Sequence, residues 1–375
     1  MKPLVEIGPE LDADALARYS RHLLVPGIGI EGQRRLANAS VCVVGAGGLG
    51  SPVLLYLAAA GVGSITVIDH DVVDLSNLQR QVLHRTQDLG EPKALSAARA
   101  VVDLNPLIKI TPLISELNDD NVVDVLSGHD LVIDGTDNFA TRYLVGDTCA
   151  DLGMPVVWAA VLRFDAQIAT FMPEPLVAAE DATSLRDLFP MLPPPEATPS
   201  CSDAGVLGML TGQVGSIMAG EAIKLITGAG EPLVGRVLLL DSASMRMREV
   251  PLRPRPVGAV ASAPKATSAP ERFDAITPAE LAAQRDAVTV LDVREPGEHA
   301  LGLIDGAHAI PLDEVLTWED LGALPDGPLV VTCKLGPRAR RAATHLRSLG
   351  HADLSLLSGG MVAWTEEIDP SLIRY

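Results

Sequence analysis

The chain has 375 residues, of which 47% are hydrophobic and 3% aromatic, and its formal net charge is −19 at pH 7. This length is enough for two or three domains, and so negative a charge argues against a general nucleic-acid binder, which needs a cationic surface to neutralise phosphates. A core made from Ala, Val, Leu and Ile is typical of buried parallel strands covered by helices.

The sequence predicts a cytoplasmic protein that does not contact a membrane. Its first residues, MKPLVEIGPELDADALARY, contain no apolar signal core. Apolar stretches such as VLLYLAAAGVGSITVI are interrupted by Gly within too few residues to span a bilayer. The four cysteines (Cys42, Cys149, Cys201 and Cys333) are widely spaced, which does not fit a disulfide scaffold and indicates reduced thiols.

The first two thirds of the chain predict a Rossmann-like α/β domain with a mixed, largely parallel sheet. The segment ASVCVVGAGGLGSPVLLYLAAAG predicts a strand, a Gly-rich turn and a helix. Further strands are expected in SITVIDHD, PLIKITPL, HDLVIDGTDN, MPVVWAAV and AQIATFM. The segment GVLGMLTGQVGSIMAGEAIKLITG predicts a long helix that ends at Gly228. Strands that alternate with helices indicate parallel pairing.

A change of composition divides the chain into domains. The segment PLRPRPVGAVASAPKATSAPER is rich in Pro, Ala and Ser and has no apolar face, so we predict a linker over residues 251–271. Residues 1–250 then form the first domain and residues 272–375 a second, smaller α/β domain. A proline-rich loop, LFPMLPPPEATPSCSD, lies inside the first domain, and loops of this length are often functional.

The Gly-rich turn indicates a nucleotide site. GAGGLG fits G-x-G-x-x-G with Gly45, Gly47 and Gly50, which let the backbone approach a phosphate at a helix N-terminus. Asp69 ends the next strand, where an acidic residue can bind a ribose hydroxyl. These two features alone favour NAD, and a plain strand–helix turn is the alternative.

The residues after Asp69 favour a triphosphate over NAD. Asn77, Gln79 and Arg80 follow the strand end, and Lys93 comes soon after. Two cations beside a phosphate loop can neutralise the charge that builds as a phosphoryl centre is attacked. DGTDN adds Asp134 and Asp137 at another strand end, and a carboxylate beside a triphosphate is a natural Mg²⁺ ligand.

Four of these segments carry a family resemblance. GAGGLGSP, DHDVVDLSNLQRQ, GEPKALSAAR and DGTDNFATRY resemble the adenylating domain of the MoeB/ThiF family, which is related to ubiquitin-activating enzymes. Together with the C-terminal domain, the chain from about Ala17 onward resembles the MoeZ-like fusions of an adenylyltransferase and a sulfurtransferase.

The resemblance implies that the chain uses ATP and Mg²⁺, with Asp137 as the Mg²⁺ ligand and Arg80 and Lys93 as catalytic residues. It also implies a homodimer in which Arg21, or else Arg18, reaches into the partner's site. The implied ATP-site residues are Gly45, Gly47, Gly48, Gly50, Asp69, Ser76, Asn77, Gln79, Arg80, Lys93, Asp137 and Asn138.

The implied substrate is the C-terminal Gly-Gly tail of a small ubiquitin-like sulfur carrier of the MoaD/ThiS/CysO kind. Its carboxylate attacks the α-phosphate of ATP and forms an acyl-adenylate, which makes a poor electrophile reactive toward sulfur. Because both proteins are acidic, we expect docking through an apolar patch and backbone pairing of the tail. Many members of the family carry two CxxC pairs for a structural zinc, but this chain has none, so no structural zinc is expected.

Two of the cysteines are candidate nucleophiles. Cys201 lies just before the long helix, where family members place a cysteine that joins the carrier; a half-buried loop cysteine is the alternative. Cys42 and Cys149 are expected in the core. The segments LDVREPGEH, GAHAIP and VVTCKLGPR resemble a rhodanese domain in which Cys333 carries a persulfide.

The segment around Cys333 is suited to holding an anionic sulfur. Lys334 and Arg338 supply positive charge, and the loop through Gly336 can turn its amides toward the sulfur, which favours the thiolate. Asp292 and Arg294 are expected to brace the domain as a pair. The family loop often has Ser or Thr where this chain has Ala339, which leaves the sulfur donor, a cysteine desulfurase or thiosulfate, open.

The predicted function is therefore adenylation of a carrier's C-terminal glycine, followed by sulfur transfer from Cys333 to give the carrier thiocarboxylate. The pathway stays open among molybdopterin, thiamin and cysteine biosynthesis, tRNA thiolation and protein conjugation. A nicotinamide-dependent oxidoreductase with an accessory domain is an alternative, although Arg80, Lys93 and Asp137 argue against it. A rhodanese domain that serves only for docking is another.

Overall fold

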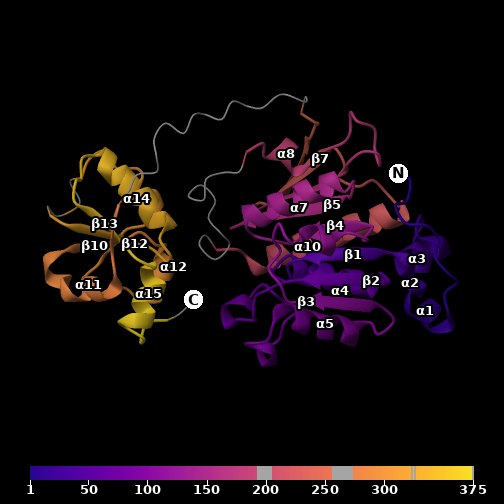
Figure 1. Ribbon diagram of the computed structural model, residues 1–375, viewed down its shortest axis with the longest axis horizontal. Helices are drawn as coiled ribbons and strands as arrows, with labels where there is room; N and C mark the ends of the chain where they lie inside the picture. The colour runs from indigo at the N-terminus through magenta and orange to yellow at the C-terminus, as the bar shows by residue number, and fades with distance from the viewer. Residues whose placement is uncertain (192–204, 256–272, 322–323, 325–326, 374–375) are drawn as a thin grey trace. The chain divides into compact units, whose positions relative to one another are not determined.

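The computed structural model describes residues 1–191, 205–255, 273–321, 324 and 327–373. They form two compact units, the first ending at residue 255 and the second beginning at residue 273 (Figure 1). Cys201 and residues 256–271 of the predicted linker lie outside the described residues. Among the residues described, no helix is long and apolar enough to cross a membrane.

The first unit contains an eight-stranded sheet in the order β3-β2-β1-β4-β5-β6-β7-β8. The first five strands of this order are parallel, and β6, β7 and β8 extend the sheet in antiparallel pairing. This confirms the predicted mixed, largely parallel sheet. The strands are β1 (Ser40–Val44), β2 (Ser64–Ile68), β3 (Lys109–Leu113), β4 (Leu131–Asp134), β5 (Val156–Leu162), β6 (Asp165–Phe171), β7 (Arg236–Asp241) and β8 (Arg246–Pro251).

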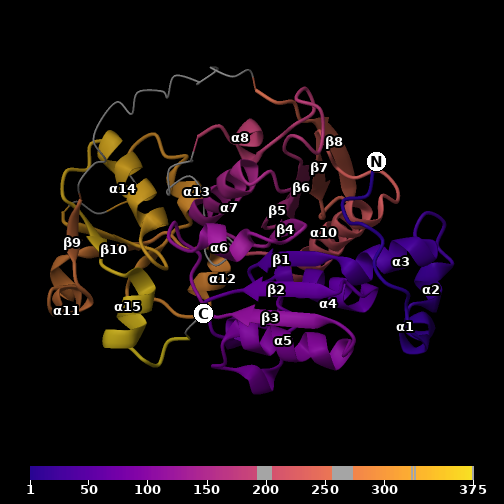
Figure 2. The same ribbon diagram turned by 45° about the vertical axis from the view of Figure 1, so that its right-hand side comes forward.

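Helices cover both faces of this sheet (Figure 2). The helices are α1 (Ala13–Arg18), α2 (Ser20–Leu23), α3 (Gly29–Asn38), α4 (Gly50–Ala60), α5 (Lys93–Leu104), α6 (Val122–Leu126), α7 (Phe139–Asp151), α8 (Leu185–Leu188) and α10 (Gly208–Thr227). Two short 3₁₀ turns, η1 (Leu75–Asn77) and η2 (Thr86–Asp88), follow β2. The predicted long helix is α10, which ends at Gly228 in the left-handed conformation.

Successive side chains of β1 point to opposite faces of the sheet, and each face has its own hydrophobic core. Val41 and Val43 point into the core shared with α3, α4, α5 and α10, whereas Cys42 and Val44 point into the core shared with α6 and α7. Cys42 and Cys149 are both buried in this second core, as predicted. Burial raises the pKa of the Cys42 thiol to about 12 and also raises that of Cys149, so neither thiol ionises readily.

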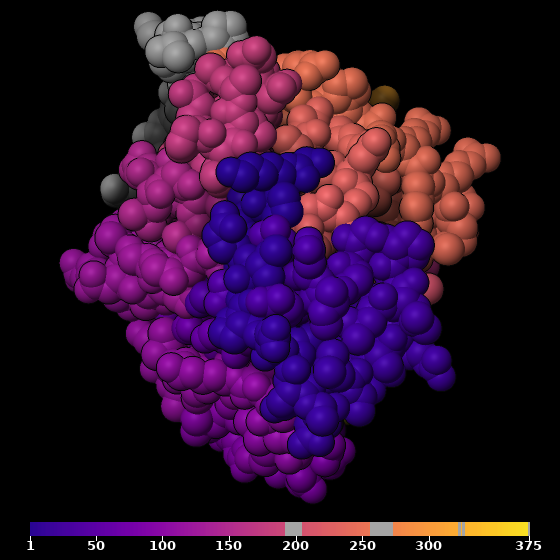
Figure 3. Space-filling model, turned by 90° about the vertical axis from the view of Figure 1, so that its right-hand side faces the viewer, coloured from indigo at the N-terminus to yellow at the C-terminus, as the bar shows by residue number. Residues whose placement is uncertain are grey.

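The two ends of the first unit's chain pack against its two different cores. The N-terminal residues run beside the end of α10, where Leu4 N–H donates to the Leu225 carbonyl at 2.9 Å. Figure 3 shows these indigo residues along the surface next to the orange residues from later in the unit. At the other end, Leu252 follows β8 and is buried in the core with α7, so the compact unit extends past residue 250.

The second unit contains a parallel five-stranded sheet in the order β11-β10-β12-β13-β9. The strands are β9 (Asp274–Ile276), β10 (Thr289–Asp292), β11 (His308–Ala309), β12 (Leu329–Thr332) and β13 (Leu354–Leu357). The helices are α11 (Pro278–Ala283), α12 (Pro296–His299), α13 (Leu312–Val315), α14 (Pro337–Ser348) and α15 (Gly360–Glu367), with a 3₁₀ turn η4 (Arg285–Ala287). The predicted strands in TVLDVRE and LVVTCK and the helix in RARRAATHLRSLG are thus confirmed as β10, β12 and α14.

Candidate active sites

The Gly-rich turn joins the end of β1 to the N-terminus of α4. Gly45 has φ +92°, a backbone conformation that favours glycine. A Cβ atom on Gly50 would lie 1.9 Å from the carbonyl oxygen of Gly45, so only glycine fits where α4 begins. The tight turn therefore places the first amides of α4 beside the carboxyl end of the sheet, where they can bind an anion.

A cavity of about 1100 Å³ opens at this end of the sheet. It is lined by the ends of β1, β2 and β4, through Val44, Ile68 and Gly135. Nine of the predicted ATP-site residues lie around it: Gly45, Gly47, Gly48, Asp69, Asn77, Arg80, Lys93, Asp137 and Asn138. Residues from the connections that follow β1, β2 and β4 therefore converge on one space.

Four other predicted residues do not line this cavity. Gly50 acts through the backbone turn just described. Ser76 belongs to the η1 turn, where its N–H and hydroxyl both donate to Asp74 at 2.8 and 2.6 Å. Gln79 is exposed next to Arg80. Arg21 is exposed on α2 and is not among the residues that line the cavity.

Lys93 begins α5 and has a carboxylate partner that the sequence did not indicate. Its ammonium lies 2.8 Å from Asp71, and its side chain is only 7% exposed. Burial raises the pKa of Asp71, but the hydrogen bond and charge of Lys93 outweigh that effect, so the pKa of this carboxyl is lowered. Asp71 therefore holds the buried cation at the cavity wall.

The two carboxylates of DGTDN differ in their surroundings. Asp134 is fully buried at the end of β4 and accepts hydrogen bonds from the N–H and hydroxyl of Thr136 at 3.0 and 2.6 Å. Burial raises its pKa. Asp137 is exposed and lines the cavity. Of the two, Asp137 is the carboxylate that can meet a bound nucleotide.

Asp69 ends β2 and contacts the Gly-rich turn directly. One of its oxygens accepts from Ala46 N–H and the other from Asp71 N–H, both at 2.8 Å. The ligand atoms of Asp69, His70 and Asp71 lie within 4.8 Å of one another, which is close enough for a cation, although Asp71 already pairs with Lys93.

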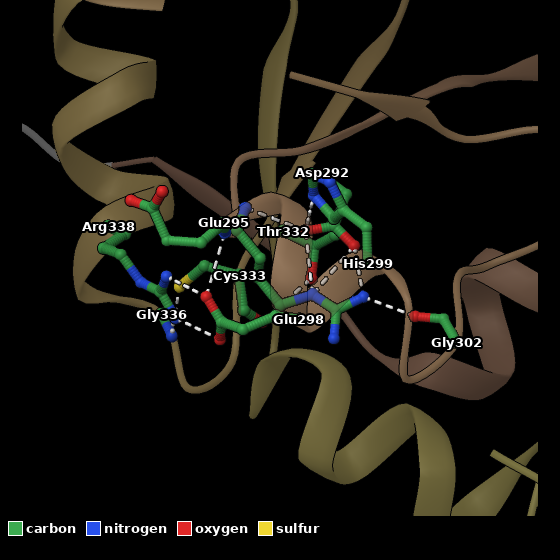
Figure 4. Close-up of polar contacts among 10 residues, drawn as sticks. Asp292, Glu295, Glu298, His299, Gly302, Thr332, Cys333, Gly336 and Arg338 are labelled. Atoms are coloured by element: carbon green, nitrogen blue, oxygen red, sulfur yellow. Dashed lines mark hydrogen bonds and ion pairs between the residues drawn. The ribbon is translucent and has the colours of Figure 1, made fainter. Parts of the chain in front are cut away.

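The second candidate site is in the second unit, where Cys333 follows β12. The residue is buried, and its sulfur accepts a hydrogen bond from Gly336 N–H at 3.1 Å. Gly336 has φ +127°, which lets the loop turn back under the sulfur before α14 begins at Pro337. Figure 4 shows this loop with Arg338 and Glu298 on the same side as the sulfur.

Arg338, one of the two cations predicted to favour the Cys333 thiolate, has a carboxylate partner that the sequence did not indicate. Its guanidinium makes a two-point contact with the carboxylate of Glu298 on α12, with one distance of 2.8 Å. Glu298 also accepts from Glu295 N–H at 2.9 Å and so caps the start of α12. A carboxylate therefore lies beside the loop that carries Cys333 and offsets the charge of one of its cations.

The pair of Asp292 and Arg294 braces the second unit, as predicted. Arg294 is 1% exposed and reaches both oxygens of Asp292 at 2.7 to 3.0 Å. Nη2, which contacts Asp292, also donates to the carbonyl of Gly302 at 2.7 Å. This fork fixes the end of β10 against the loop after α12 (Figure 4).

Comparisons with known proteins identify the families of both units. The ThiF family model matches residues 19–259, and the rhodanese-like domain model matches residues 277–367. The probable adenylyltransferase/sulfurtransferase MoeZ of Mycobacterium tuberculosis is 44% identical over 397 aligned residues, covering 100% of this chain and 99% of that protein.

Two further comparisons concern the first unit. The sulfur carrier protein adenylyltransferase of Thermus thermophilus is 49% identical over 243 residues, covering 65% of this chain and 89% of that protein. Among solved structures, Escherichia coli MccB with ATP aligns with a TM-score of 0.55 at 22% identity, covering 68% of this chain and 75% of that chain. This last likeness concerns the fold alone.

Proposed function

The chain belongs to the ThiF family and has a rhodanese-like domain in its second unit. From this premise we propose that its two sites catalyse two successive steps of one reaction. The enzyme is an adenylyltransferase and a sulfurtransferase, like its full-length relative. Its first unit adenylates the C-terminal glycine of a ubiquitin-like sulfur carrier, and Cys333 then supplies sulfur to make the thiocarboxylate. The observation that carries this proposal is the convergence of Arg80, Lys93 and Asp137 on the cavity at the Gly-rich turn.

In the first step a carboxylate oxygen of the carrier attacks the α-phosphorus of ATP, and the bond to the bridging oxygen breaks, releasing pyrophosphate. Lys93 and Arg80 stabilise the charge that spreads over the phosphates. Asp137 is the residue proposed to hold Mg²⁺, which shields phosphate charge when bound. ATP–pyrophosphate exchange that depends on a Gly-Gly carrier tests this step, and no exchange with any such carrier would contradict it.

In the second step the outer sulfur of a Cys333 persulfide attacks the carbonyl carbon of the acyl-adenylate, and AMP leaves. The product is an acyl disulfide between the carrier and Cys333. A thiol then attacks the Cys333 sulfur, which releases the carrier thiocarboxylate and leaves a disulfide between Cys333 and that thiol. Cys201 is one candidate for this thiol and a small-molecule thiol is another. Cys201 lies outside the described residues, so its role stays a prediction.

Three further proposals follow from the same resemblance. Arg21 is exposed and does not line its own cavity, which supports a role in the partner's site of a homodimer. Leu24 and Val25 follow it and are 73% and 43% exposed, as expected for an interface.

The cytoplasm remains the proposed location. The absence of structural zinc remains a prediction that metal analysis of the purified protein tests.

An apolar patch near the cavity is the proposed docking surface for the carrier. The patch comprises Phe164, Met209, Met245 and Met247, each at least 50% exposed. Met209 and Phe164 both contact Ser242, in the turn between β7 and β8. Val161 near the end of β5 lines the cavity and lies three residues before Phe164, which supports a position of the patch beside the ATP site. An acidic enzyme that binds an acidic carrier gains from apolar rather than charged contacts.

Met247→Asp is therefore expected to raise the KM for the carrier roughly tenfold, because an apolar contact is lost and a like charge is added. The KM for ATP should not change. Steady-state pyrophosphate exchange at varied carrier concentration measures both. Val123→Asp on α6, at another exposed apolar position, is the matched control. An unchanged KM for the carrier in Met247→Asp would remove this patch from the proposal.

The charges around Cys333 support a protein persulfide over thiosulfate as the sulfur donor. Thiosulfate is a dianion, and the carboxylate of Glu298 contacts Arg338 beside the loop that carries Cys333. A donor that presents its sulfur on a cysteine side chain brings less negative charge into the pocket. On this basis we propose a cysteine desulfurase or another persulfide-bearing protein as the donor.

Glu298→Gln is expected to raise kcat/KM for thiosulfate about tenfold, because one negative charge near the sulfur is removed in a partly screened site. Thiosulfate-to-cyanide transfer measures the change. Glu280→Gln is the matched control. Glu280 accepts from Thr277 N–H at 2.9 Å and so caps α11, just as Glu298 caps α12. Glu280 is on a different helix from Glu298, the residue that pairs with Arg338. Equal rates in the two variants would contradict this view of the donor.

A further inference from the structure

The peptide groups around Ala46, in the Gly-rich turn, are held on two sides. Ala46 N–H donates to Asp69, which follows β2, at 2.8 Å. The carbonyl of Ala46 lies 2.9 Å from Nε2 of His84, a residue that no sequence motif singled out. Ala46 and His84 are 0% and 5% exposed, so water does not compete for these contacts.

His84 is itself fixed by a second hydrogen bond. Its Nδ1 lies 2.8 Å from the hydroxyl of Ser96 on α5, and that hydroxyl lies 2.9 Å from Asp88. Asp88 is held in turn by Arg85 N–H and by Arg99, at 2.8 and 2.7 Å. Burial lowers the pKa of His84. The Ala46 carbonyl can only accept a hydrogen bond. The hydrogen bond between it and His84 therefore requires a hydrogen on Nε2, whether or not Nδ1 also carries one.

The orientation of the next peptide follows from its planarity. In a trans peptide the carbonyl and the following N–H point in opposite directions. Because the Ala46 carbonyl points to His84, the N–H of Gly47 points away from it, and Gly47 lines the cavity. This N–H donates to no described residue. If the peptide flipped, a carbonyl oxygen would face the phosphates and repel them.

We propose that His84 is a positioning residue for adenylation, which holds the Ala46 carbonyl so that the Gly47 N–H stays aimed into the cavity as a donor to a phosphate oxygen of ATP. This inference rests on the proposed nucleotide site, but it does not need the carrier or the sulfur-transfer step. A purely structural role for His84 is the alternative, in which the ring only fills space between the turn and α5.

A pair of substitutions separates the two roles. Gln and Met have similar volume and flexibility, but only Gln carries an N–H donor that can reach the carbonyl. His84→Met is expected to weaken the binding of a non-hydrolysable ATP analogue about tenfold, the size of one hydrogen bond to a charged acceptor. The affinity of His84→Gln for the same analogue should stay within about threefold of that of the unchanged protein. Calorimetric titration of the full-length chain measures both.

Two further variants separate a positioning role of His84 from a general effect of losing a buried histidine. His129 is held by two similar hydrogen bonds, to Leu126 and Thr66, outside the cavity, so His129→Met reports the effect of removing a structural histidine. If His84→Met does not fold, His84→Phe takes its place as the variant without a donor. Equal affinity in the Gln and Met variants overturns the inference. If the unchanged protein binds the analogue but shows no carrier-dependent exchange, the proposed function fails while this test still stands.

Discussion

Lys93→Ala is expected to abolish adenylate formation, with a loss of about a thousandfold in ATP–pyrophosphate exchange, as found when a preorganised charge-stabilising group is removed. The side chain lies at the cavity wall, 7% exposed, so water replaces it poorly. The substitution also leaves Asp71 without its 2.8 Å partner and with a negative charge facing the phosphates. Loss of the cation and repulsion by the anion therefore act in the same direction.

Exchange of labelled pyrophosphate into ATP, in the presence of a Gly-Gly carrier, measures this effect. Lys109→Ala, at an exposed position on β3, controls for a general change in charge. Asp137→Ala should give a comparable loss if Asp137 holds Mg²⁺, and excess Mg²⁺ should restore part of it. Exchange retained in both Lys93→Ala and Asp137→Ala would mean that the nucleotide binds elsewhere.

Cys333→Ala should leave exchange intact and stop thiocarboxylate formation completely. The thiol lies in the second unit, in a loop that contributes nothing to the cavity of the first unit, so the two activities should separate cleanly. Without Cys333 the persulfide needed for the second step does not form, so the acyl-adenylate returns to ATP, hydrolyses or reacts with another nucleophile that carries no sulfane sulfur. The mass of the carrier after incubation with ATP and a sulfur donor measures the second activity.

Cys42→Ala is the matched control, because that buried thiol has a raised pKa and takes no part in either site. Cys201→Ala should have a milder effect than Cys333→Ala if another thiol can reduce the acyl disulfide. A complete loss in Cys201→Ala would show that the relay through Cys201 is obligatory. Thiocarboxylate formed at the usual rate by Cys333→Ala would remove the rhodanese loop from the reaction.

Much of the first unit could be predicted because its signals are local. The apolar run before GAGGLG and the glycines of that turn are adjacent in sequence, and the ends of parallel strands meet at one edge of the sheet. The cavity therefore gathers residues that short motifs already marked, such as Arg80 and Asp137. The hairpin of β7 and β8 was not predicted, since it continues the sheet by antiparallel pairing without a distinct sequence motif.

The contacts that tune the two sites could not be predicted, because each joins residues far apart in the chain. Asp71 and Lys93 are 22 residues apart, and Glu298 and Arg338 are 40 apart. The sequence marked Arg338 as a cation but gave no sign that Glu298 would lie against it. Likewise, nothing in the segment around His84 shows that its ring turns back to the Gly-rich turn.

One measurement tests the central claim most directly. The full-length chain is incubated with Mg²⁺–ATP, a Gly-Gly sulfur carrier and a persulfide donor, and the intact mass of the carrier is recorded. We predict that one oxygen of the carrier is replaced by sulfur only when ATP is present and Cys333 is intact. A carrier whose mass never changes while ATP is converted to AMP and pyrophosphate would contradict the coupling of the two units in one reaction.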